Sequence, residues 1–266
     1  TGNLLANDTD EENDTLSVQP VTSGGIYGFL MLAGDGSYTY TLFSDPFLSP
    51  VVQSLRAGQT VSDTFAYRAS DGIALSNVAR LTVTIHGTND APVAIPVTGN
   101  VHEDDTSLIV TANFSDADYG DTHSFAINTS GTAGSVINNG DGTFTYDPNG
   151  QFEYLSASET ATDTFTFTVD DGNGGSGTST VTITITGRND APLSQDSIAA
   201  ATEDGIAVSG QLVADDIDSD DDVASLVYSL VSGPGEGTVT VNFDGTFSFD
   251  PGNDFQNLAM GETQDV

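Results

Sequence analysis

The sequence predicts an all-β chain of tandem Greek-key sandwich repeats of the immunoglobulin or cadherin kind, joined in an elongated array. Three observations carry this prediction. The segment Asn89-Asp90-Ala91-Pro92 returns unchanged 100 residues later, at residues 189–192. Before each copy, at residues 81–87 and 181–187, apolar side chains occupy every second position, which is typical of a half-buried strand. Between the two copies, short turn motifs such as Asp-Gly separate one predicted strand from the next, at the spacing that small antiparallel sandwiches show.

Each copy of Asn-Asp-Ala-Pro is interpreted as a joint between two sandwiches. Proline cannot donate to a β-ladder and holds the preceding residue in extended backbone, so the four residues should form a stiff, polar connection. We call residues 89–92 the first joint and residues 189–192 the second joint. The sequence then predicts repeat 1 at 1–88, repeat 2 at 89–188 and repeat 3 at 189–266. Repeat 2 is expected to be complete, repeat 1 to lack its first strand and repeat 3 to lack its last two strands.

Within the repeats, the same elements follow in the same order. The first is predicted to be a strand that ends in Asp-x-Asp, at residues 1–10, 109–118 and 209–218. A hairpin follows, in which Asp-Gly suits a tight turn because glycine accepts a positive φ, at residues 35–40, 141–146 and 244–249. A further strand begins at Asp63 and at Asp163 and ends in Asp-Gly at residues 71–72 and 171–172. The last strand then runs into the joint.

The composition excludes several classes of function. The net charge is −35, with no lysine and four arginines, so nucleic acid and anionic membrane are not expected partners. Cysteine is absent, which excludes disulfides, thiolate chemistry and zinc–thiolate sites. No segment is apolar enough to span a bilayer, and residues 1–30 do not resemble a signal peptide. Because repeats 1 and 3 are expected to be incomplete, a fragment of a longer protein is expected. Most of the acid is aspartate, which favours turns and which oxygen-binding cations prefer.

Four motifs occur together in repeat 2 and its joints: Gly-x-Asn-Asp-Ala-Pro, Asp-Ala-Asp, Asp-Gly-Thr-Phe-Thr-Tyr and Asp-Thr-Phe-Thr-Phe-x-Val-x-Asp-Gly. In combination they resemble the VCBS and cadherin-like tandem repeats of very large bacterial surface proteins, including RTX-type adhesins. The resemblance covers the whole chain. It implies a calcium-stiffened, rod-like extender of a secreted or surface-anchored adhesin that supports cell adhesion or biofilm, without catalytic activity.

The predicted geometry collects acidic residues at the first joint. Successive strands of a sandwich run in opposite directions, so the Asp-x-Asp turn and the Asp-Gly turn of repeat 2 should meet at its N-terminal end. Calcium takes six to eight oxygen ligands, and carboxylates without a cation repel one another and should loosen the joint. The predicted calcium ligands at the first joint are Asn89, Asp90, Asp116, Asp118 and Asp171.

At the second joint, the resemblance adds Glu103, because cadherins place a glutamate on their first strand. Glu103 follows Pro92 by eleven residues, roughly 36 Å of extended chain, which would carry it to the C-terminal end of repeat 2. The predicted calcium ligands here are Glu103, Asn189, Asp190, Asp216 and Asp218, together with Glu159. Cadherins carry a further acid before the Asn-Asp pair, where this chain has Thr88 and Arg188, and Gln59 stands in the place of Glu159 in repeat 1. One or two calcium ions per joint are therefore expected.

Two alternatives remain open for the acids. The joint motifs could be turn caps satisfied by backbone N–H groups, and several other acids could be solvated loop residues, namely Asp14, Asp121 and residues 220–222. Three functions also remain: the extender, which we expect, a ligand-binding adhesion module for sugar or protein, and an accessory array on a secreted hydrolase. The candidate ligand patch is residues 21–33, with Ile26, Tyr27, Phe29 and Leu30, for which core packing is the commoner explanation.

Against catalysis, no Gly-x-Ser-x-Gly motif occurs, and the paired carboxylates recur with the repeat, as structural features do. The expected location is the bacterial cell surface or its surroundings. Besides calcium, the partners left open are a cell-surface glycan or protein contacted through other regions, and self-association through repeat 3.

Overall fold

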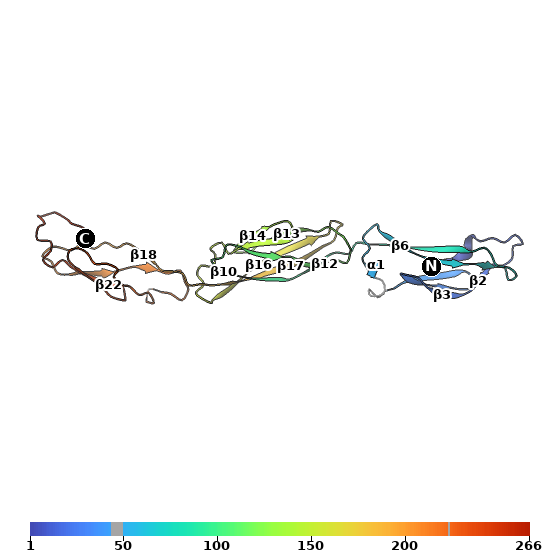
Figure 1. Cartoon of the computed structure of the whole chain (residues 1–266), viewed down its shortest axis with the longest axis horizontal. Helices are drawn as coiled ribbons and strands as arrows, with labels where there is room; N and C mark the ends of the chain where they lie inside the picture. Colours follow the sequence, from blue (N-terminus) through green and yellow to red (C-terminus); the bar gives the residue numbers. More distant parts are fainter. Residues whose placement is uncertain (44–49, 223) are drawn as a thin grey trace.

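The structure, a computed structural model, describes residues 1–43, 50–222 and 224–266. Three β-rich units lie end to end, and the chain passes once from each unit to the next, so the molecule is a long rod (Figure 1). Within the described residues, helix is limited to two single turns, η1 and α1. The predicted all-β tandem array is thereby confirmed. We keep the names repeat 1, repeat 2 and repeat 3, whose boundaries stay predictions.

Repeat 2 is a two-layer sandwich. One sheet has the strand order β10-β17-β16-β13, the other has the order β11-β15-β14, and β9 pairs with β12. The strands are β9 (Val93–Ile95), β10 (Val97–His102), β11 (Leu108–Thr111), β12 (Asn113–Ser115), β13 (Ser124–Asn128), β14 (Ser135–Asn138), β15 (Thr143–Asp147), β16 (Thr160–Asp170) and β17 (Ser176–Thr186). The last two are the longest, and their antiparallel ladder joins residues 160–170 to residues 176–186. This ladder runs between the two ends of repeat 2, where the joints lie (Figure 1).

One pairing in repeat 2 departs from the predicted antiparallel pattern. β10 pairs with β17 in parallel, from Val97 opposite Val181 to His102 opposite Thr186. Both strands run from the first joint towards the second, so they can be neighbours only in parallel. The opening segment reaches this place by changing partners at Pro96, because β9 pairs with β12 before the proline and β10 joins the other sheet after it. Proline interrupts the ladder at this point because it has no N–H to donate.

The core of repeat 2 follows the alternation predicted from the sequence. Val181, Ile183 and Ile185 of β17 are fully buried, while the residues between them are partly exposed. Phe144 from β15 packs edge-to-face against Phe165, with ring centroids 5.7 Å apart. Fully burying one such side chain stabilises the fold by about 1.5–3 kcal/mol, so this core fixes the sandwich on which both joints are built.

A buried aspartate links the layers in repeats 1 and 2. Asp163 Oδ2 accepts hydrogen bonds from the Tyr146 hydroxyl and from the Gly134 N–H, both at 2.8 Å. In repeat 1, Asp63 Oδ2 accepts from the Tyr40 hydroxyl at 2.7 Å. Burial, and then the bond to its aspartate, raise the pKa of the Tyr40 phenol and of the Tyr146 phenol. The first aspartate of the repeated Asp-Thr-Phe motif is therefore a structural residue, and it lies away from the joints.

Repeat 1 contains one four-stranded sheet, β1-β5-β4-β3, and the pairs β6-β8 and β2-β7. Its elements are β1 (Gly2–Asn3), η1 (Leu4–Asn7), β2 (Ser17–Val18), β3 (Val21–Gly24), β4 (Gly28–Leu32), β5 (Ser37–Leu42), α1 (Pro50–Gln53), β6 (Thr60–Tyr67), β7 (Ala69–Ser70) and β8 (Ala79–His86). The predicted strand over residues 1–10 is wrong beyond Asn3. The Asn3 side chain accepts a hydrogen bond from Leu5 N–H at 2.8 Å and starts the 3₁₀ turn η1 instead.

The predicted ligand patch at residues 21–33 divides between surface and core. Ile26 is 71% exposed, whereas Leu30 is 2% exposed and belongs to the core. Tyr27 and Phe29 are half-buried. Core packing therefore explains part of this segment, and Ile26 remains on the surface.

Repeat 3 has the three-stranded sheet β19-β22-β21 and the pair β18-β20. The strands are β18 (Leu193–Ser194), β19 (Val208–Gln211), β20 (Ala214–Asp215), β21 (Thr238–Val241) and β22 (Thr246–Asp250). Phe249 packs edge-to-face against Phe255, with ring centroids 6.3 Å apart. In the described part of the chain, no helix is long and apolar enough to cross a membrane.

Candidate cation-binding joints

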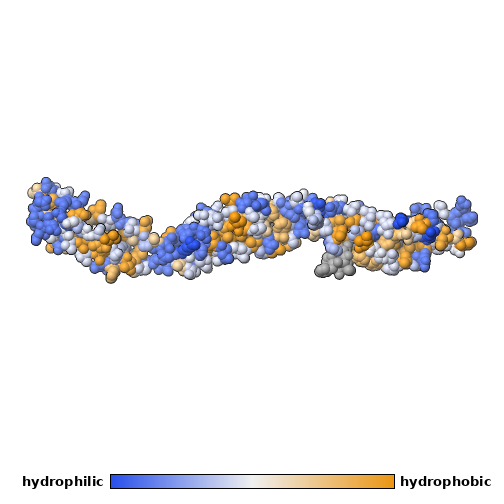
Figure 2. Space-filling view, viewed as in Figure 1, coloured by the Kyte–Doolittle hydropathy of each residue, from blue (hydrophilic) through white to orange (hydrophobic). Residues whose placement is uncertain are grey.

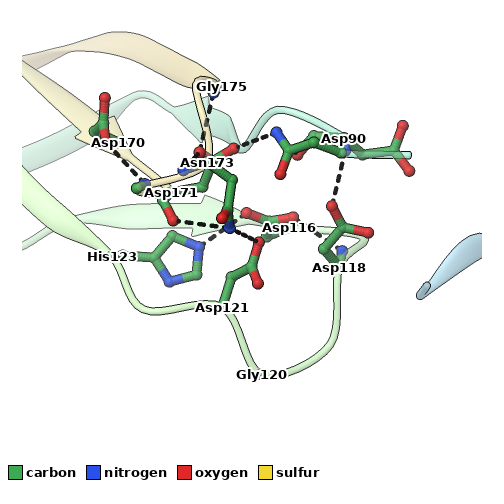
Figure 3. Close-up of polar contacts among 12 residues, drawn as sticks. Asp90, Asp116, Asp118, Gly120, Asp121, His123, Asp170, Asp171, Asn173 and Gly175 are labelled. Carbon is green, nitrogen blue, oxygen red and sulfur yellow. Dashed lines mark hydrogen bonds and ion pairs between the residues drawn. The ribbon is translucent and has the colours of Figure 1, made fainter. Parts of the chain in front are cut away.

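At the first joint, the Asp-x-Asp turn after β12 folds back under the joint. The Asp90 N–H donates to Asp118 Oδ2 at 2.8 Å, and the Asp118 N–H donates to Asp116 Oδ1 at 2.9 Å. The second bond is an Asx turn, which the Asp-x-Asp spacing favours. Figure 3 shows the Asp118 side chain reaching the backbone of Asp90. The turn is thereby fixed to the backbone of the joint.

The turn between β16 and β17 brings Asp171 to the same place. Asp171 is 1% exposed, and its Oδ2 accepts from the Asn89 side-chain amide at 2.8 Å. Its Oδ1 accepts from the N–H groups of Asn173 at 2.7 Å and Gly175 at 3.0 Å. The bond from Asn89, followed by these backbone bonds, lowers the pKa of the Asp171 carboxyl against the effect of burial. The five ligands predicted for the first joint are thus linked by hydrogen bonds in two groups, Asp90 with Asp116 and Asp118, and Asn89 with Asp171.

The turn-cap alternative leaves buried oxygens at this joint without a partner in the described part of the chain. Asp118 is 3% exposed, and while its Oδ2 accepts from Asp90, its Oδ1 has no hydrogen-bond partner among the described residues. The same holds for Asn89 Oδ1. Burial raises the pKa of the Asp118 carboxyl, and the charges of Asp90 and Asp121 raise it further. A buried acceptor without a partner is costly unless water or an ion satisfies it.

Asp121 is not the solvated loop acid that the sequence left open. Its side chain is fully buried, and oxygens of Asp116, Asp118 and Asp121 all lie within 4.8 Å of one another. The Asn173 side-chain amide donates to Asp121 Oδ2 at 3.0 Å, as Figure 3 shows. The spacing Asp-x-Asp-x-x-Asp, which occurs at 116–121 and again at 216–221, is the sequence signal that could have identified Asp121.

The second joint repeats this geometry 100 residues later. The Asp190 N–H donates to Asp218 Oδ2 at 2.8 Å, and the Asp218 N–H donates to Asp216 Oδ1 at 3.1 Å. Asp218 is 3% exposed, and its Oδ1 has no partner among the described residues. Oxygens of Asp216, Asp218 and Asp221 lie within 4.8 Å of one another, so Asp221 belongs to the cluster and not to the solvated loop. Hydrophilic surface gathers where the rod narrows between repeats 2 and 3 (Figure 2).

Glu103 reaches the second joint, at the place that the sequence predicts for it. It is 2% exposed; its Oε1 accepts a short hydrogen bond from the Arg188 N–H, and its Oε2 has no partner in the described part of the chain. Burial raises the pKa of the Glu103 carboxyl, and the neighbouring charges of Glu153 and Asp190 raise it further. Glu103 is thus a buried carboxylate that faces other carboxylates.

Glu159 also reaches across the second joint. Its Oε2 accepts from the Ser219 hydroxyl at 2.6 Å and from the Ser156 N–H at 3.2 Å. Asn189 differs from Asn89, because its amide donates only to the carbonyl of Asp190 among the described residues. The structure therefore brings together Glu103, Asp190, Asp216, Asp218 and, through Ser219, Glu159, and leaves Asn189 at the edge.

The sequence analysis missed two acids at the second joint. Oxygens of Asp104, Glu153 and Asp190 lie within 4.8 Å of one another. Burial raises the pKa of the Glu153 and Asp190 carboxyls; the charge of Asp190 raises the pKa of Glu153 further, and the charge of Asp104 that of Asp190. Both residues lie in turns and reach the joint through the fold. The signal that could have identified Asp104 is the pair Glu103-Asp104, which recurs as Glu203-Asp204, whereas no such pattern marks Glu153. Arg188, at 3.6 Å from Asp104, partly offsets this charge from the outside.

The donor set is chemically suited to a hard divalent cation. Apart from the His123 imidazole, whose Nε2 lies 2.9 Å from Asp116 Oδ2 at the first joint, the groups brought together are carboxylate or amide oxygens. The two joints keep Asp118, Asp218 and Glu103 buried with an oxygen unpartnered. Calcium binds such oxygens in flexible geometries, whereas zinc prefers nitrogen and sulfur. These residues fit a calcium ion at each joint better than they fit a turn that is complete without one.

Comparison with known proteins gives two domain types. Residues 1–87 and 89–187 match the family model described as "Bacterial cadherin-like domain", and residues 189–263 match the one described as "Bacterial Ig domain". Repeat 3 therefore differs from the cadherin-like prediction. The search of curated proteins finds no match.

Among solved structures, the chain is similar to three-domain cadherin fragments. Mouse cadherin-23 EC22-24 has a TM-score of 0.54 at 17% identity, covering 92% of this chain and 78% of that one. Human CDH23 EC21-23 has a TM-score of 0.55 at 14% identity, covering 96% and 92%. Protocadherin gamma C5 EC1-3 has a TM-score of 0.53 at 17% identity, covering 97% and 86%. At this level of identity the similarity shows a common fold.

Proposed function

Because this chain belongs to the bacterial cadherin-like domain family, whose modules are typical of adhesion or extender regions of extracellular and surface proteins, we propose that it is a stalk stiffened by calcium. It holds a binding tip away from a bacterial cell and has no catalytic role of its own. The parent protein in this proposal is a large surface adhesin of the VCBS or RTX type, active in cell adhesion or biofilm. The end-to-end arrangement of the repeats supports this proposal (Figure 1).

A single recurring observation carries the proposal. At both joints a buried aspartate, Asp118 or Asp218, holds the backbone N–H of the joint with one oxygen and keeps the other unpartnered. Turn caps need only the first oxygen. A calcium ion at the second would tie the Asp-x-Asp turn to the joint and hold the flanking repeats at a fixed angle. Without the ion, the facing carboxylates repel and the joint loosens.

The residues that would hold calcium at the first joint are Asn89, Asp90, Asp116, Asp118, Asp121 and Asp171. Those at the second joint are Glu103, Glu153, Glu159, Asp190, Asp216, Asp218 and Asp221. When bound, the ion supplies charge compensation and a fixed coordination shell; the protein supplies oxygens from segments on both sides of the joint. The number of ions is proposed as one or two at each joint.

The test is small-angle scattering of the chain in millimolar calcium and in excess chelator, with thermal melts in parallel. The proposal expects a long rigid rod in calcium, and a shorter mean end-to-end distance with a lower Tm in chelator. Magnesium at the same concentration is the control for ionic strength and for divalent charge alone. A shape and Tm that ignore calcium would show that the carboxylates are turn formers.

A second candidate is a ligand-binding adhesion module, which one observation in repeat 1 favours. A groove of about 690 Å³ lies there between β2 and the end of β6, and its apolar lining includes Leu32, Tyr67, Leu75 and Val78. Leu75 is 69% exposed and Val78 49% exposed, so apolar surface is accessible beside the groove. Saturable binding of a glycan or peptide to the chain, lost in Leu75→Asp, would support this candidate over a stalk without a ligand.

A further inference from the structure

The two joints share one backbone contact, which we call the frame, but they differ in the side chains that repeat 1 and repeat 2 place beside it. The carbonyl of Ser54 accepts from Tyr119 N–H at 3.3 Å at the first joint, and the carbonyl of Tyr154 accepts from Ser219 N–H at 2.9 Å at the second. These four residues are in equivalent positions, 100 residues apart. The frame therefore allows the lining residues of the two joints to be compared position by position.

The comparison shows a difference in charge. Glu153 and Glu159 of repeat 2 correspond to Gln53 and Gln59 of repeat 1, so two carboxylates are replaced by neutral amides. Between them, Ser156 corresponds to Arg56. The backbone contacts are kept, because the Arg56 N–H donates to Gln59 Oε1 at 3.2 Å just as the Ser156 N–H donates to Glu159 Oε2 at 3.2 Å. The first joint thus receives one positive charge where the second receives two negative ones.

The guanidinium of Arg56 crosses the first joint and contacts the acidic turn of repeat 2. Its Nη1 donates to the carbonyl of Gly120 at 3.1 Å and lies 3.3 Å from Asp121 Oδ1. The Asp121 side chain is fully buried, while the Arg56 side chain is 37% exposed. Asp121 belongs to the cluster with Asp116 and Asp118, so the arginine compensates the acids that a cation would otherwise compensate.

The second joint makes no such contact at the equivalent position. There the Ser156 hydroxyl lies 3.0 Å from the Ser219 hydroxyl and accepts from the Asp220 N–H at 3.0 Å. These bonds are neutral, and the charges of Glu103 and Asp218 beside them keep an unpartnered oxygen each. Arg188, the arginine near these acids, lies 3.6 Å from Asp104 and 3.8 Å from Asp105 of repeat 2 itself, so among the described residues no guanidinium bridges the two repeats at the second joint.

We propose that Arg56 is a built-in cation of the first joint, which keeps the angle between repeats 1 and 2 fixed when divalent cations are removed. A covalently attached guanidinium cannot be diluted or chelated, and it donates to a carbonyl and forms an ion pair with a carboxylate of the opposite repeat. The contrast with the second joint rests on the proposed calcium function, whereas the role of Arg56 does not. When calcium is removed, the stalk is then unequal along its length, because the chain itself still holds the first joint while the second joint loosens.

Because the chain has no cysteine, pairs of engineered cysteines can carry spin labels without background. The pair Ser62→Cys and Asn113→Cys spans the first joint, and the pair Thr162→Cys and Val213→Cys spans the second. All four positions are exposed, and each pair occupies equivalent places in its repeats. Pulsed electron spin resonance of the full chain then gives the distance distribution across each joint, in calcium and in excess chelator.

The perturbing variant is Arg56→Ser, which places in repeat 1 the residue that repeat 2 carries. Arg80→Ser, at an exposed position of β8, is the control with the same change of charge. The mirror variant Ser156→Arg tests whether a guanidinium can fix the second joint. A melt of each variant in calcium shows whether the repeats remain folded.

The proposal expects a narrow distribution across the first joint in chelator, which is lost in Arg56→Ser and kept in Arg80→Ser. It also expects Ser156→Arg to narrow the distribution across the second joint in chelator. A first joint in Arg56→Ser that stays as narrow as in the unmodified chain would overturn the role of Arg56. If neither joint of the unmodified chain responds to chelator but Arg56→Ser broadens the first, the role of Arg56 stands and the proposed calcium function fails.

Discussion

Glu103→Gln isolates the contribution of one buried carboxylate to calcium binding. The substitution keeps the size of the side chain and an oxygen that can accept from Arg188 N–H, so the fold of repeat 2 should persist. It removes the charge that faces Glu153 and Asp190. Two opposite consequences follow, one in chelator and one in calcium.

In calcium, the unmodified chain should be stabilised by mass action. Extracellular calcium sites have dissociation constants of about 10⁻⁴–10⁻³ M, so about 5 mM calcium contributes about 1 to 2 kcal/mol per site. For a domain of about 100 residues, this raises Tm by roughly 4 to 15 °C. Loss of a charged ligand should weaken binding by about 100-fold, which leaves less than about 0.3 kcal/mol at the same concentration.

In chelator, the difference in Tm between the variant and the unmodified chain should vanish or change sign. Burial raises the pKa of the Glu103 carboxyl, which means that the folded state disfavours its charge. Glu103→Gln should therefore melt at the same temperature as the unmodified chain or higher when calcium is absent, and lower when it is present. Glu11→Gln, an exposed acid in the loop after η1, is the matched control and should melt like the unmodified chain in both conditions.

The assay is calorimetry of the full chain over a calcium titration. A variant that gains as much Tm from calcium as the unmodified chain would refute a ligand role for Glu103. A variant that loses stability equally with and without calcium would instead make Glu103 a structural acceptor for Arg188. A Tm of the variant that is equal or higher in chelator and lower in calcium agrees with the reasoning.

Three further outcomes can be measured on the same chain. Tyr146→Phe removes one hydrogen bond from the buried Asp163 carboxylate, and chemical denaturation should show a loss of about 1.5–3 kcal/mol that calcium does not change; an unchanged stability would mean that the bond is not made in solution. Gly187→Ala places a Cβ 2.3 Å from the carbonyl oxygen of Leu155, so circular-dichroism melts should show that repeat 2 is destabilised. Gly72→Ala is the comparison: its Cβ meets no atom within 4 Å, so it tests the cost of a positive φ alone. In chelator, Tm should rise as pH falls from about 7 to about 5, because the raised pKa of Glu103 makes the folded state bind its proton more tightly, and this stability is lost again as pH rises through the folded pKa. In calcium the trend should reverse, since protons compete with the ion; a Tm that rises equally in both conditions would contradict the cation site.

Much of the fold could be predicted because its signal is local. The alternation at Val181, Ile183 and Ile185 dictates a strand with one buried face, and all three side chains are fully buried. The joints could be located because Asn-Asp-Ala-Pro recurs at a fixed period. The approach of the Asp-x-Asp turn to the joint followed from strand direction alone, and the bond from Asp90 N–H to Asp118 agrees with it.

What was missed depends on contacts between distant segments. Glu153 carries no motif, and the place of Glu153 and Asp104 beside Asp190 results from loops that the fold brings together. The 3₁₀ turn at Leu4–Asn7 depends on one bond, from Leu5 N–H to the Asn3 side chain, which competes with a strand of the same apolar content. The contact of Arg56 with Gly120 spans 64 residues and two repeats, so no local pattern could indicate it.

The parallel pairing of β10 with β17 decides how repeat 2 carries tension. The chain enters repeat 2 beside the first joint through the segment that becomes β10, and leaves through the end of β17 at the second joint. A pull on the two ends draws these neighbouring strands in opposite directions along their length. The six residue pairs of their register are then sheared together instead of being opened one after another. Force spectroscopy should find that repeat 2 yields in one abrupt event, and Val101→Pro, which removes a donor from this ladder, should lower the force at which it yields.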